Sequence, residues 1–337
     1  MTRRVTLLAP FFIPGCAWID DFCLRADFEF RKVPFTDRLV PWHGRGRLTP
    51  ASEWFAYLRY ARRALEEPSD CVVTSFPQLA FAAAALLPLR TRQPPRLIAW
   101  NFNLGSLASR VKGWAAGRVL ERVDRFVVHA RSEAADYAAW LGLDRSRFRF
   151  VPLQRGRLGP LPPSPIAGSY IVSMGSANRD YRTLAEAVRG TGIRTVVIAK
   201  RDLLQALPPT PEIVGLHGLG QDECNSILAG AALNVVPIRD GRTASGQVTF
   251  TTAMRLGVAT VATRCVGTVD YIVDGETGLL VPSGDALSMR GAIEILWRDE
   301  TRRRQLAEAG RRHADAEFSD EAAGRHLAKA IDEVLAA

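Results

Sequence analysis

Short apolar runs alternate with helix-length segments along the whole of this 337-residue chain. A run of four or five apolar residues suits a buried strand, and a helix between two such runs brings the chain back so that the strands pair in parallel. In the first half the strand-like runs are Val5–Ala9, Cys71–Thr74, Leu97–Trp100, Phe126–His129 and Phe148–Pro152. Helical patterns lie between them at Ala51–Glu67, Gln78–Leu87, Ser109–Val123 and Glu133–Leu141. The alternation predicts an α/β chain built on mostly parallel sheets.

The segment 156–168 interrupts this alternation. It is rich in proline and glycine, which is the composition of a linker. After it, strand-like runs return at Tyr170–Met174, Thr195–Ala199, Leu233–Pro237 and Val258–Thr263, with helical patterns at Tyr181–Arg189, Gln221–Ala231, Gln247–Leu256 and throughout Ser288–Leu335. We therefore expect two Rossmann-like domains, residues 1–155 and 169–315, and a C-terminal helix within 316–337.

The composition is that of a globular chain, with 47% hydrophobic and 23% charged residues. The longest apolar run, Leu79–Leu89, has about half the length that a membrane-spanning helix needs. We interpret Val5–Pro10 as a first strand rather than part of a signal peptide, because no small-residue cleavage site follows it. The five cysteines show no metal-ligand spacing and are typical of buried thiols in a reducing compartment, so we expect a cytoplasmic protein.

The net charge of +9 is concentrated in the first half, where residues 1–160 contain 25 lysines and arginines against 14 acidic residues. Part of the excess lies on the expected helix Ser109–Val123, in which Trp114 is accompanied by Arg110, Lys112, Arg118 and Arg122. Such a helix suits an anionic membrane surface, here the inner face of the membrane, or a pyrophosphate-linked acceptor. A solvated basic face on an arginine-rich protein explains the same pattern. No nucleic-acid-binding motif accompanies the charge, so no nucleic-acid partner is expected.

The segment Arg242–Asp285 combines two glycine turns with a helix and a buried strand. The small residues Thr243–Gly246 lie just before the helical pattern Gln247–Leu256, and a second turn opens at Gly267–Thr268. Glycine lets a ligand approach the backbone closely, and the first amides of a helix are unpaired at the positive end of its dipole. The arrangement suits a diphosphate, although an ordinary helix–strand unit has the same spacing.

This segment resembles the donor-binding core of retaining glycosyltransferases with the GT-B fold, especially those of family 4. The matching positions are Ala253-Met254, Gly257, Gly267, Asp270, Tyr271-Ile272, Asp274-Gly275, Gly278, Leu280-Val281 and Gly284-Asp285. The resemblance implies two Rossmann-like domains facing a central cleft, with the C-terminal helix crossing back to the first domain. It also implies transfer of a sugar from a nucleotide sugar to a glycan or lipid-linked glycan acceptor, in polysaccharide or glycolipid biosynthesis.

Four positions depart from the family pattern. The two motif acids, spaced E-x7-E, are replaced by Ala244 and Thr252, and the second of these acids usually holds the donor ribose. Ser176 stands where the family has an Arg after the first strand of the second domain, and Asn101 stands where members often carry a His that contacts the reacting sugar. A carboxylate accepts hydrogen bonds from two vicinal hydroxyls, whereas a threonine hydroxyl makes one such bond at most. Donor recognition is therefore expected to differ at several points together.

The resemblance and the position of residues just after strands indicate the rest of the site. Arg179 and Lys200 are the cations expected to neutralise the donor diphosphate, and with Asn101 they form the expected catalytic set. The alternative role of Arg179 is a surface ion pair with Asp180, and that of Lys200 is an ordinary charge at the end of a strand. The expected donor-binding residues are Gly175, Ser245, Gly246, Gln247, Val248, Thr249, Thr252, Thr268 and Asp270. On the acceptor side we expect Gly15, Asp20 and Asp21, although either aspartate can equally cap a helix near Phe22.

Retaining transfer on this fold is expected to need electrostatic stabilisation of the leaving diphosphate rather than a protein nucleophile. No cofactor is expected, because the nucleotide sugar is itself the substrate, and no metal is expected, because the sequence has no DxD-type acidic cluster. Three alternatives remain open. One is a GT-B protein that has lost turnover and serves as a binding partner, and another is a sugar-nucleotide epimerase, whose acidic and histidine residues we do not locate. The third is a dinucleotide oxidoreductase, which is disfavoured because no G-x-G-x-x-G follows the first strand.

Overall fold

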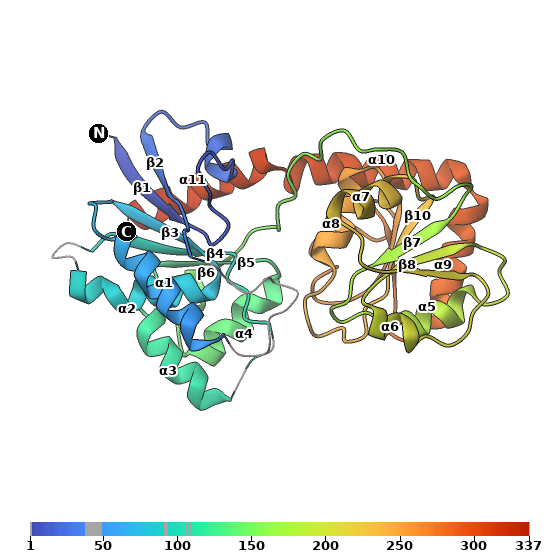
Figure 1. Ribbon diagram of the computed structural model, residues 1–337, viewed down its shortest axis with the longest axis horizontal. Helices are drawn as coiled ribbons and strands as arrows, with labels where there is room; N and C mark the ends of the chain where they lie inside the picture. The colour runs from blue at the N-terminus through green and yellow to red at the C-terminus, as the bar shows by residue number, and fades with distance from the viewer. Residues whose placement is uncertain (1, 38–48, 91–93, 106, 108, 337) are drawn as a thin grey trace. The chain divides into compact units, whose positions relative to one another are not determined.

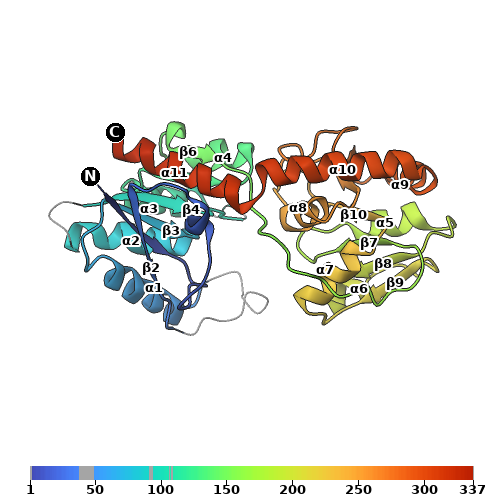
Figure 2. The same cartoon turned by 90° about the horizontal axis from the view of Figure 1, so that it is seen from above.

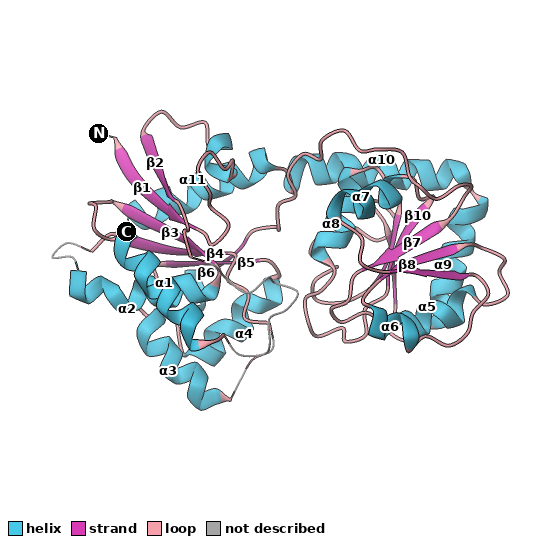
Figure 3. Cartoon of the chain, in the orientation of Figure 1, coloured by secondary structure: helices cyan, strands magenta, loops and turns pink. Residues whose placement is uncertain are grey.

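The computed structural model of this chain describes residues 2–37, 49–90, 94–105, 107 and 109–336 (Figure 1). The chain divides into two compact units, one formed by Met1–Val151 together with Ala323–Ala337 and the other by Pro152–Ala322. Each unit is a six-stranded sheet with helices on both faces (Figure 3). Among the described residues the strands of both sheets pair in parallel, for example Val5 opposite Cys71 and Ile171 opposite Thr195.

The first unit has the strand order β2-β1-β3-β4-β5-β6. Its strands are β1 (Arg3–Leu8), β2 (Phe28–Val33), β3 (Cys71–Ser75), β4 (Arg96–Trp100), β5 (Arg125–Val128) and β6 (Phe148–Phe150). Its helices are α1 (Ala51–Ala64), α2 (Pro77–Arg90), α3 (Arg110–Leu120), α4 (Arg131–Leu141) and most of α11 (Asp320–Ala336), with the short 3-10 helices η1 (Ile19–Phe22) and η3 (Arg145–Arg147).

Successive residues of the first sheet enter two separate cores, because side chains alternate between the faces of a strand. Val72 and Leu97 pack on the face covered by α1–α4, whereas Val73 and Ile98 pack on the face covered by α11. Leu327 of α11 is fully buried in this second core. Figures 1 and 2 show the helices α1–α4 and the helix α11 on opposite sides of the strands. The C-terminal helix therefore completes the first unit.

The second unit has the strand order β12-β11-β10-β7-β8-β9. Its strands are β7 (Ile171–Met174), β8 (Thr195–Ile198), β9 (Ile213–Leu216), β10 (Leu233–Val236), β11 (Thr260–Thr263) and β12 (Leu279–Val281). Its helices are α5 (Tyr181–Val188), α6 (Arg201–Gln205), α7 (Gln221–Ala229), α8 (Gln247–Arg255), α9 (Ala286–Arg298) and α10 (Glu300–Glu317). Helices α5 and α9 pack on one face of the sheet, and α7 and α8 pack on the other.

The predicted α/β class with two parallel sheets is confirmed. The sequence did not indicate β2, β9 and β12, and the stretch predicted to be helical after Ser288 comprises α9, α10 and α11. Asp299 separates α9 from α10, because its carboxylate accepts a hydrogen bond from the Arg302 amide at 2.9 Å and caps the start of α10. None of the described helices combines the length and the apolar character that crossing a bilayer requires.

Candidate functional site

The strand order of the second unit creates a topological switch point beside β7. From β7 the chain adds β8 and β9 on one side of the sheet, and then β10, β11 and β12 on the other. The loops that leave the carboxyl ends of β7 and β10 therefore diverge, and ligands of open parallel sheets bind in such a crevice. Residues 175–180 and 237–246 form these two loops.

Asn178 joins the two loops. Its amide nitrogen donates to Asp240 O at 3.1 Å and to Ser245 Oγ at 3.2 Å, and its amide oxygen accepts from Asp240 N at 3.1 Å. Its carbonyl accepts from Arg239 N at 3.1 Å. The φ of Asn178 is +54°, in the left-handed region that asparagine adopts more readily than most residues. Asn178 therefore fixes the two loops relative to each other.

Arg179 lies beneath the first loop, with only 6% of its surface exposed. Its guanidinium donates to Met174 O at 3.1 Å, to Ala177 O at 2.8 Å and to Thr249 Oγ1 at 3.1 Å. Gly175 permits this position, because a Cβ there would lie 2.7 Å from Nη2 of Arg179. Burial lowers the pKa of the Arg179 guanidinium, and among the described residues no carboxylate offsets that effect. A buried cation without an anionic neighbour is suited to an anionic ligand.

The N-terminus of α8 lies against Arg179 through Thr249. Gly246 caps this helix with a φ of +89°, and a Cβ there would lie 2.9 Å from Cγ1 of Val236. The Thr249 amide donates back to Gly246 O at 2.9 Å, whereas the amides of Gln247 and Val248 precede the first helical hydrogen bonds. Val248 is 58% exposed, so this end of the helix is open to solvent. The first amides of α8 and the Arg179 guanidinium together form a positively charged corner.

The turn at Gly267 packs on the loop before α8. A Cβ on Gly267 would lie 2.8 Å from Cα of Ala244, so only glycine fits there. The next residue, Thr268, is fully buried, and its hydroxyl donates to Thr263 O at 2.8 Å and accepts from the Cys265 amide at 2.8 Å. Thr268 thus holds the turn through its side chain, and the adjoining Asp270 is half-buried.

Thr252, at the position of the missing motif acid, faces inward on α8. It is 3% exposed, and its hydroxyl donates to Val248 O at 2.6 Å within the same helix. The hydroxyl proton is therefore already used, and only the oxygen lone pairs of Thr252 can accept a bond from a ligand.

Lys200 is exposed at the start of α6. Its backbone amide donates to Ser176 Oγ at 3.1 Å, which links the loop after β8 to the loop after β7. The structure thus brings most of the expected donor-binding residues to one edge of the second sheet, with Arg179 at the centre and Lys200 at the margin.

In the first unit, Asn101 belongs to a buried polar chain. His129 lies with Nδ1 2.8 Å from Val151 O and with Nε2 2.7 Å from Oδ1 of Asn101, and the Asn101 amide nitrogen donates to Ser75 Oγ at 2.9 Å. Burial lowers the pKa of His129 to about 4, which favours the neutral ring. A neutral ring carries a single N–H, so the tautomer of His129 decides whether it donates to Val151 O or to Oδ1 of Asn101.

His129 was not among the expected site residues. Its position directly after β5 places it at the same sheet edge as Asn101, which follows β4, and this was the one signal that the sequence offered. Asn101 has a φ of +52° and is half-buried, so its amide is held in place while part of it reaches solvent.

The loop after β1 carries the expected acceptor-side residues. Asp21 accepts from the Trp18 amide at 2.8 Å and so caps η1, while Lys32 Nζ lies 2.7 Å from the Asp21 carboxylate and 3.2 Å from that of Asp20. Burial raises the pKa of Asp20, although Lys32 opposes the effect. Gly15 is exposed in the same loop, with a φ of +76°.

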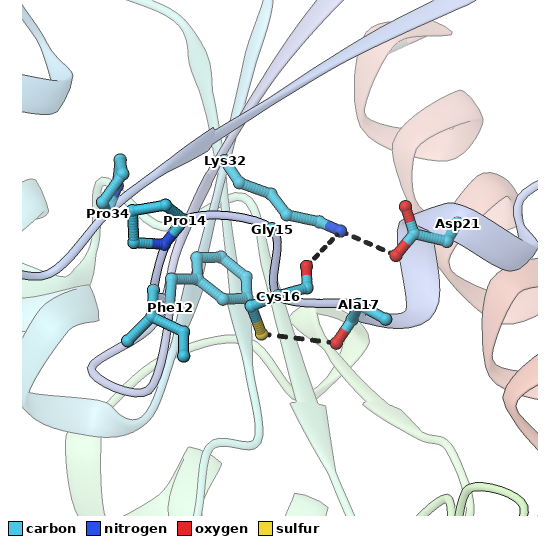
Figure 4. Close-up of a pocket in the computed structure, with 9 residues that line it drawn as sticks. Phe12, Pro14, Gly15, Cys16, Ala17, Asp21, Lys32 and Pro34 are labelled. Atoms are coloured by element: carbon cyan, nitrogen blue, oxygen red, sulfur yellow. Dashed lines mark hydrogen bonds and ion pairs between the residues drawn. The ribbon is translucent and has the colours of Figure 1, made fainter.

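A cavity of about 280 Å³ adjoins this loop and is lined by residues 12–17 with Asp21, Lys32 and Pro34. Figure 4 shows the Lys32 ammonium between the Asp21 carboxylate and the Cys16 carbonyl, which accepts its hydrogen bond at 2.9 Å. The Lys32 ammonium, which comes from β2, is thus partly neutralised by the loop after β1. Among the described residues, no group of three or more His, Cys, Asp and Glu side chains is placed to hold a metal ion.

Two family models match the two halves of the chain. The model described as Glycosyl transferase 4-like domain matches residues 4–154, and the model described as Glycosyl transferases group 1 matches residues 177–299. The second match contains Arg179 and α8, and the first contains Asn101 and the loop after β1.

Two curated relatives match part of the chain. The lipopolysaccharide core biosynthesis glycosyltransferase LpsE of Rhizobium meliloti (strain 1021) is 30% identical over 182 residues, which is 52% of each protein. The capsular polysaccharide biosynthesis glycosyltransferase CapM of Staphylococcus aureus is 33% identical over 89 residues, which is 26% of this chain and 23% of CapM. The chain thus spans about half the length of the first relative and less than a quarter of the second.

Solved structures resemble the whole chain. Sucrose-phosphate synthase from Thermosynechococcus elongatus has a TM-score of 0.69 at 18% identity and covers 99% of both chains. Anabaena HepE in complex with UDP has a TM-score of 0.68 at 13% identity, over 99% of this chain and 100% of HepE. At these identities the likeness concerns the fold, and it confirms the predicted GT-B architecture.

Proposed function

We propose that this chain, which belongs to the GT4-like glycosyltransferases of the GT-B fold, transfers a sugar from a nucleoside diphosphate sugar to a glycan or lipid-linked glycan. The observation that carries the proposal is the corner formed by Arg179 and α8. A guanidinium that is almost wholly buried, with no described carboxylate beside it, meets the first amides of a helix at the switch point of a parallel sheet. This combination is suited to a diphosphate.

In the proposed reaction, the bond between the anomeric carbon and the diphosphate oxygen breaks, and a bond from that carbon to the acceptor oxygen forms. The acceptor hydroxyl proton passes to the departing phosphate oxygen, and the configuration of the sugar is retained. The protein's part is to stabilise the charge that develops on the leaving diphosphate. We assign this part to Arg179, Lys200 and the first amides of α8, without a metal ion or a cofactor.

The proposed acceptor class is supported by the names of the two curated relatives, which refer to lipopolysaccharide core and capsular polysaccharide biosynthesis. The first donor to test is UDP-glucose, because a structural neighbour, HepE, was solved with UDP-glucose. In the first unit we assign the acceptor to the edge that carries Asn101 and the loop after β1. Asn101 is held by two neighbours and retains amide capacity for a sugar hydroxyl.

A second candidate function is nucleotide-sugar binding without turnover. It is favoured by Thr252, whose hydroxyl is bonded within α8, so the two-point hold of a carboxylate on the ribose is missing. Transfer remains our first choice, because the groups assigned to the leaving diphosphate do not include the missing acids.

The test begins with calorimetric titration of a panel of nucleotide sugars that includes UDP-glucose. It continues with transfer and donor-hydrolysis assays on lipopolysaccharide core and capsular oligosaccharides, with and without a chelator. We expect micromolar binding, transfer that a chelator does not abolish, and a product with the donor's anomeric configuration by NMR. Binding without transfer or hydrolysis for any donor would establish the second candidate. Failure of every nucleotide sugar to bind would refute both.

A further inference from the structure

Phe76 departs from two local preferences at the point where β3 ends. Its φ is +76°, in the left-handed region that bulky residues rarely adopt. Its carbonyl accepts a hydrogen bond from the Ala80 amide at 3.2 Å, so Phe76 also stands at the N-terminal cap of α2, where a small polar residue or a glycine is favoured. An asparagine or a glycine would satisfy both preferences. The local backbone therefore gives no reason for a phenylalanine at this position.

Phe76 lies beside Asn101. Ser75 is opposite Trp100 in the parallel register of β3 and β4, so the residues that follow them are the first beyond two neighbouring strands. The Phe76 amide donates to Trp100 O at 3.0 Å. Phe76 and Asn101 both have a positive φ, and only one other non-glycine residue of the described chain does, Asn178 in the crevice of the second unit. Such backbone conformations cluster at functional sites, because surrounding structure must hold them.

A second aromatic ring meets Phe76 from the loop after β1. The rings of Phe11 and Phe76 lie edge to face, with their centroids 6.3 Å apart and their planes at 86°. Phe11 also contacts Phe12 and Trp18, which are buried in the core that α11 covers. Phe11 is 42% exposed and Phe76 is half-buried, so both residues retain contact with solvent. The two rings thus form an aromatic surface that is anchored on the core and adjoins Asn101.

We propose that Phe11 and Phe76 bind one pyranose ring of a glycan acceptor, while Asn101 binds a hydroxyl of the same acceptor. A pyranose has a face of C–H groups that packs on aromatic rings, and a rim of hydroxyls that needs polar partners. The aromatic pair and the half-buried Asn101 amide offer both at one edge of the sheet. A hydrocarbon chain has no group for the amide to bond, so the chemistry favours the glycan over a lipid tail. This inference rests on the proposed function and deepens it.

The test is titration of the whole chain with lipid-free oligosaccharides of lipopolysaccharide core and capsule, with and without UDP. Saturation-transfer NMR with irradiation of the protein's aromatic protons should mark the C–H protons of one pyranose. Phe76→Leu and Phe11→Leu keep an apolar side chain but lose the aromatic face. Each should weaken glycan binding about fivefold in calorimetry, which is the scale of an aromatic contact, and leave UDP binding unchanged. Phe76→Tyr keeps the ring and should bind glycans nearly as well as the unaltered chain.

Phe76→Gly separates recognition from support of the fold. Glycine adopts a φ of +76° readily, so this variant should fold, which thermal unfolding checks, while its glycan affinity should fall at least as far as that of Phe76→Leu. The matched control is Phe30→Leu. Phe30 is also half-buried and meets Phe28 edge to face at 5.8 Å, but it lies in the middle of β2 rather than at the edge that carries Asn101. This control should bind glycans and UDP as the unaltered chain does.

Unchanged glycan affinity in folded Phe76→Leu and Phe76→Gly would overturn the proposal and leave the ring as a support for the start of α2. An equal loss of affinity for UDP would overturn it too, since the rings would then not be specific to the acceptor. Failure of every lipid-free glycan to bind the unaltered chain would also overturn it, whether or not a prenyl phosphate binds. The proposed transfer fails separately, if no nucleotide sugar binds the unaltered chain although the glycans do.

Discussion

Replacing Arg179 by methionine tests the candidate diphosphate site. The guanidinium has five N–H donors, and three of them are bonded to Met174 O, Ala177 O and Thr249 Oγ1. In the proposed complex the remaining two donate to the diphosphate. Methionine is a long, unbranched side chain that carries neither charge nor donors, so Arg179→Met removes these bonds without leaving a large hole.

The expected magnitude follows from the number and type of these bonds. A hydrogen bond to a charged group contributes about 1.5–3 kcal/mol, and each 1.4 kcal/mol is about tenfold in a dissociation constant. Arg179→Met should therefore weaken the binding of a nucleoside diphosphate by at least about tenfold. It should also lower stability, since leaving Met174 O and Ala177 O without their partner costs about 1–3 kcal/mol each.

The two effects are separated by comparing UDP with uridine in calorimetric titrations, and likewise ADP and GDP with their nucleosides. Arg179→Met should weaken binding of the diphosphate much more than that of the nucleoside. Arg179→Lys keeps the charge but loses the fork, so an intermediate loss is expected. Arg182→Met is the matched control, because that side chain is 84% exposed and pairs with Glu186.

Thermal unfolding shows which variants are folded at the temperature of titration. An unchanged affinity of folded Arg179→Met for every diphosphate would refute the assignment and leave Arg179 as a brace for its loop. Equal weakening for diphosphate and nucleoside would mean that the substitution disturbs the whole crevice rather than the phosphate contacts.

Three further outcomes are expected. The pKa of His129 falls from the ordinary 6.5 to about 4 on folding, so its contribution to the free energy of unfolding is present above pH 6.5 and is lost as pH falls toward 4. In urea unfolding, the free energy of unfolding should be about 2 kcal/mol lower at pH 5 than above pH 6.5, and His129→Gln should not show this loss. Gly117→Ala should destabilise the first unit by about 3 kcal/mol in urea unfolding, because its Cβ would meet Leu141 O, whereas Gly159→Ala, with open space around it, should have little effect. Thr252→Val should weaken the binding of UDP by about threefold to tenfold in calorimetry, because one neutral hydrogen bond is lost, and it should leave the binding of 2′-deoxy-UDP unchanged. An equal loss of affinity for both ligands would show that Thr252 does not bind the ribose.

The sequence was most informative for strands that are buried on both faces of their sheet. β3, β4 and β10 are short apolar runs, and their positions were predicted to within a residue or so. β2 was missed because it lies at an edge of its sheet and includes Glu29, Arg31 and Lys32, so it lacks the apolar run of a central strand. An edge strand pairs with only one other strand, and its own residues do not indicate which strand that is.

The candidate site shows a similar division. The glycine turns and the residues after strands indicated which segments meet. Glycine marks tight turns, and residues that follow parallel strands lie at the same edge of the sheet. The direction of individual side chains was not indicated: Thr268 is turned into its own turn, and Arg179 lies under its loop. The pairing of Asn101 with His129 joins residues that follow different strands, so only the folded sheet brings them together.

The C-terminal helix has a consequence for the order in which the two units can form during synthesis. The second unit is one continuous segment, Pro152–Ala322, whereas the first needs Ala323–Ala337 to cover one face of its sheet. The N-terminal strands leave the ribosome first, but Val73 and Ile98 stay without their cover until Leu327 has been made. The later-made unit is thus free to fold ahead of the earlier one, and the nascent first sheet exposes an apolar face that suits chaperone capture throughout that interval.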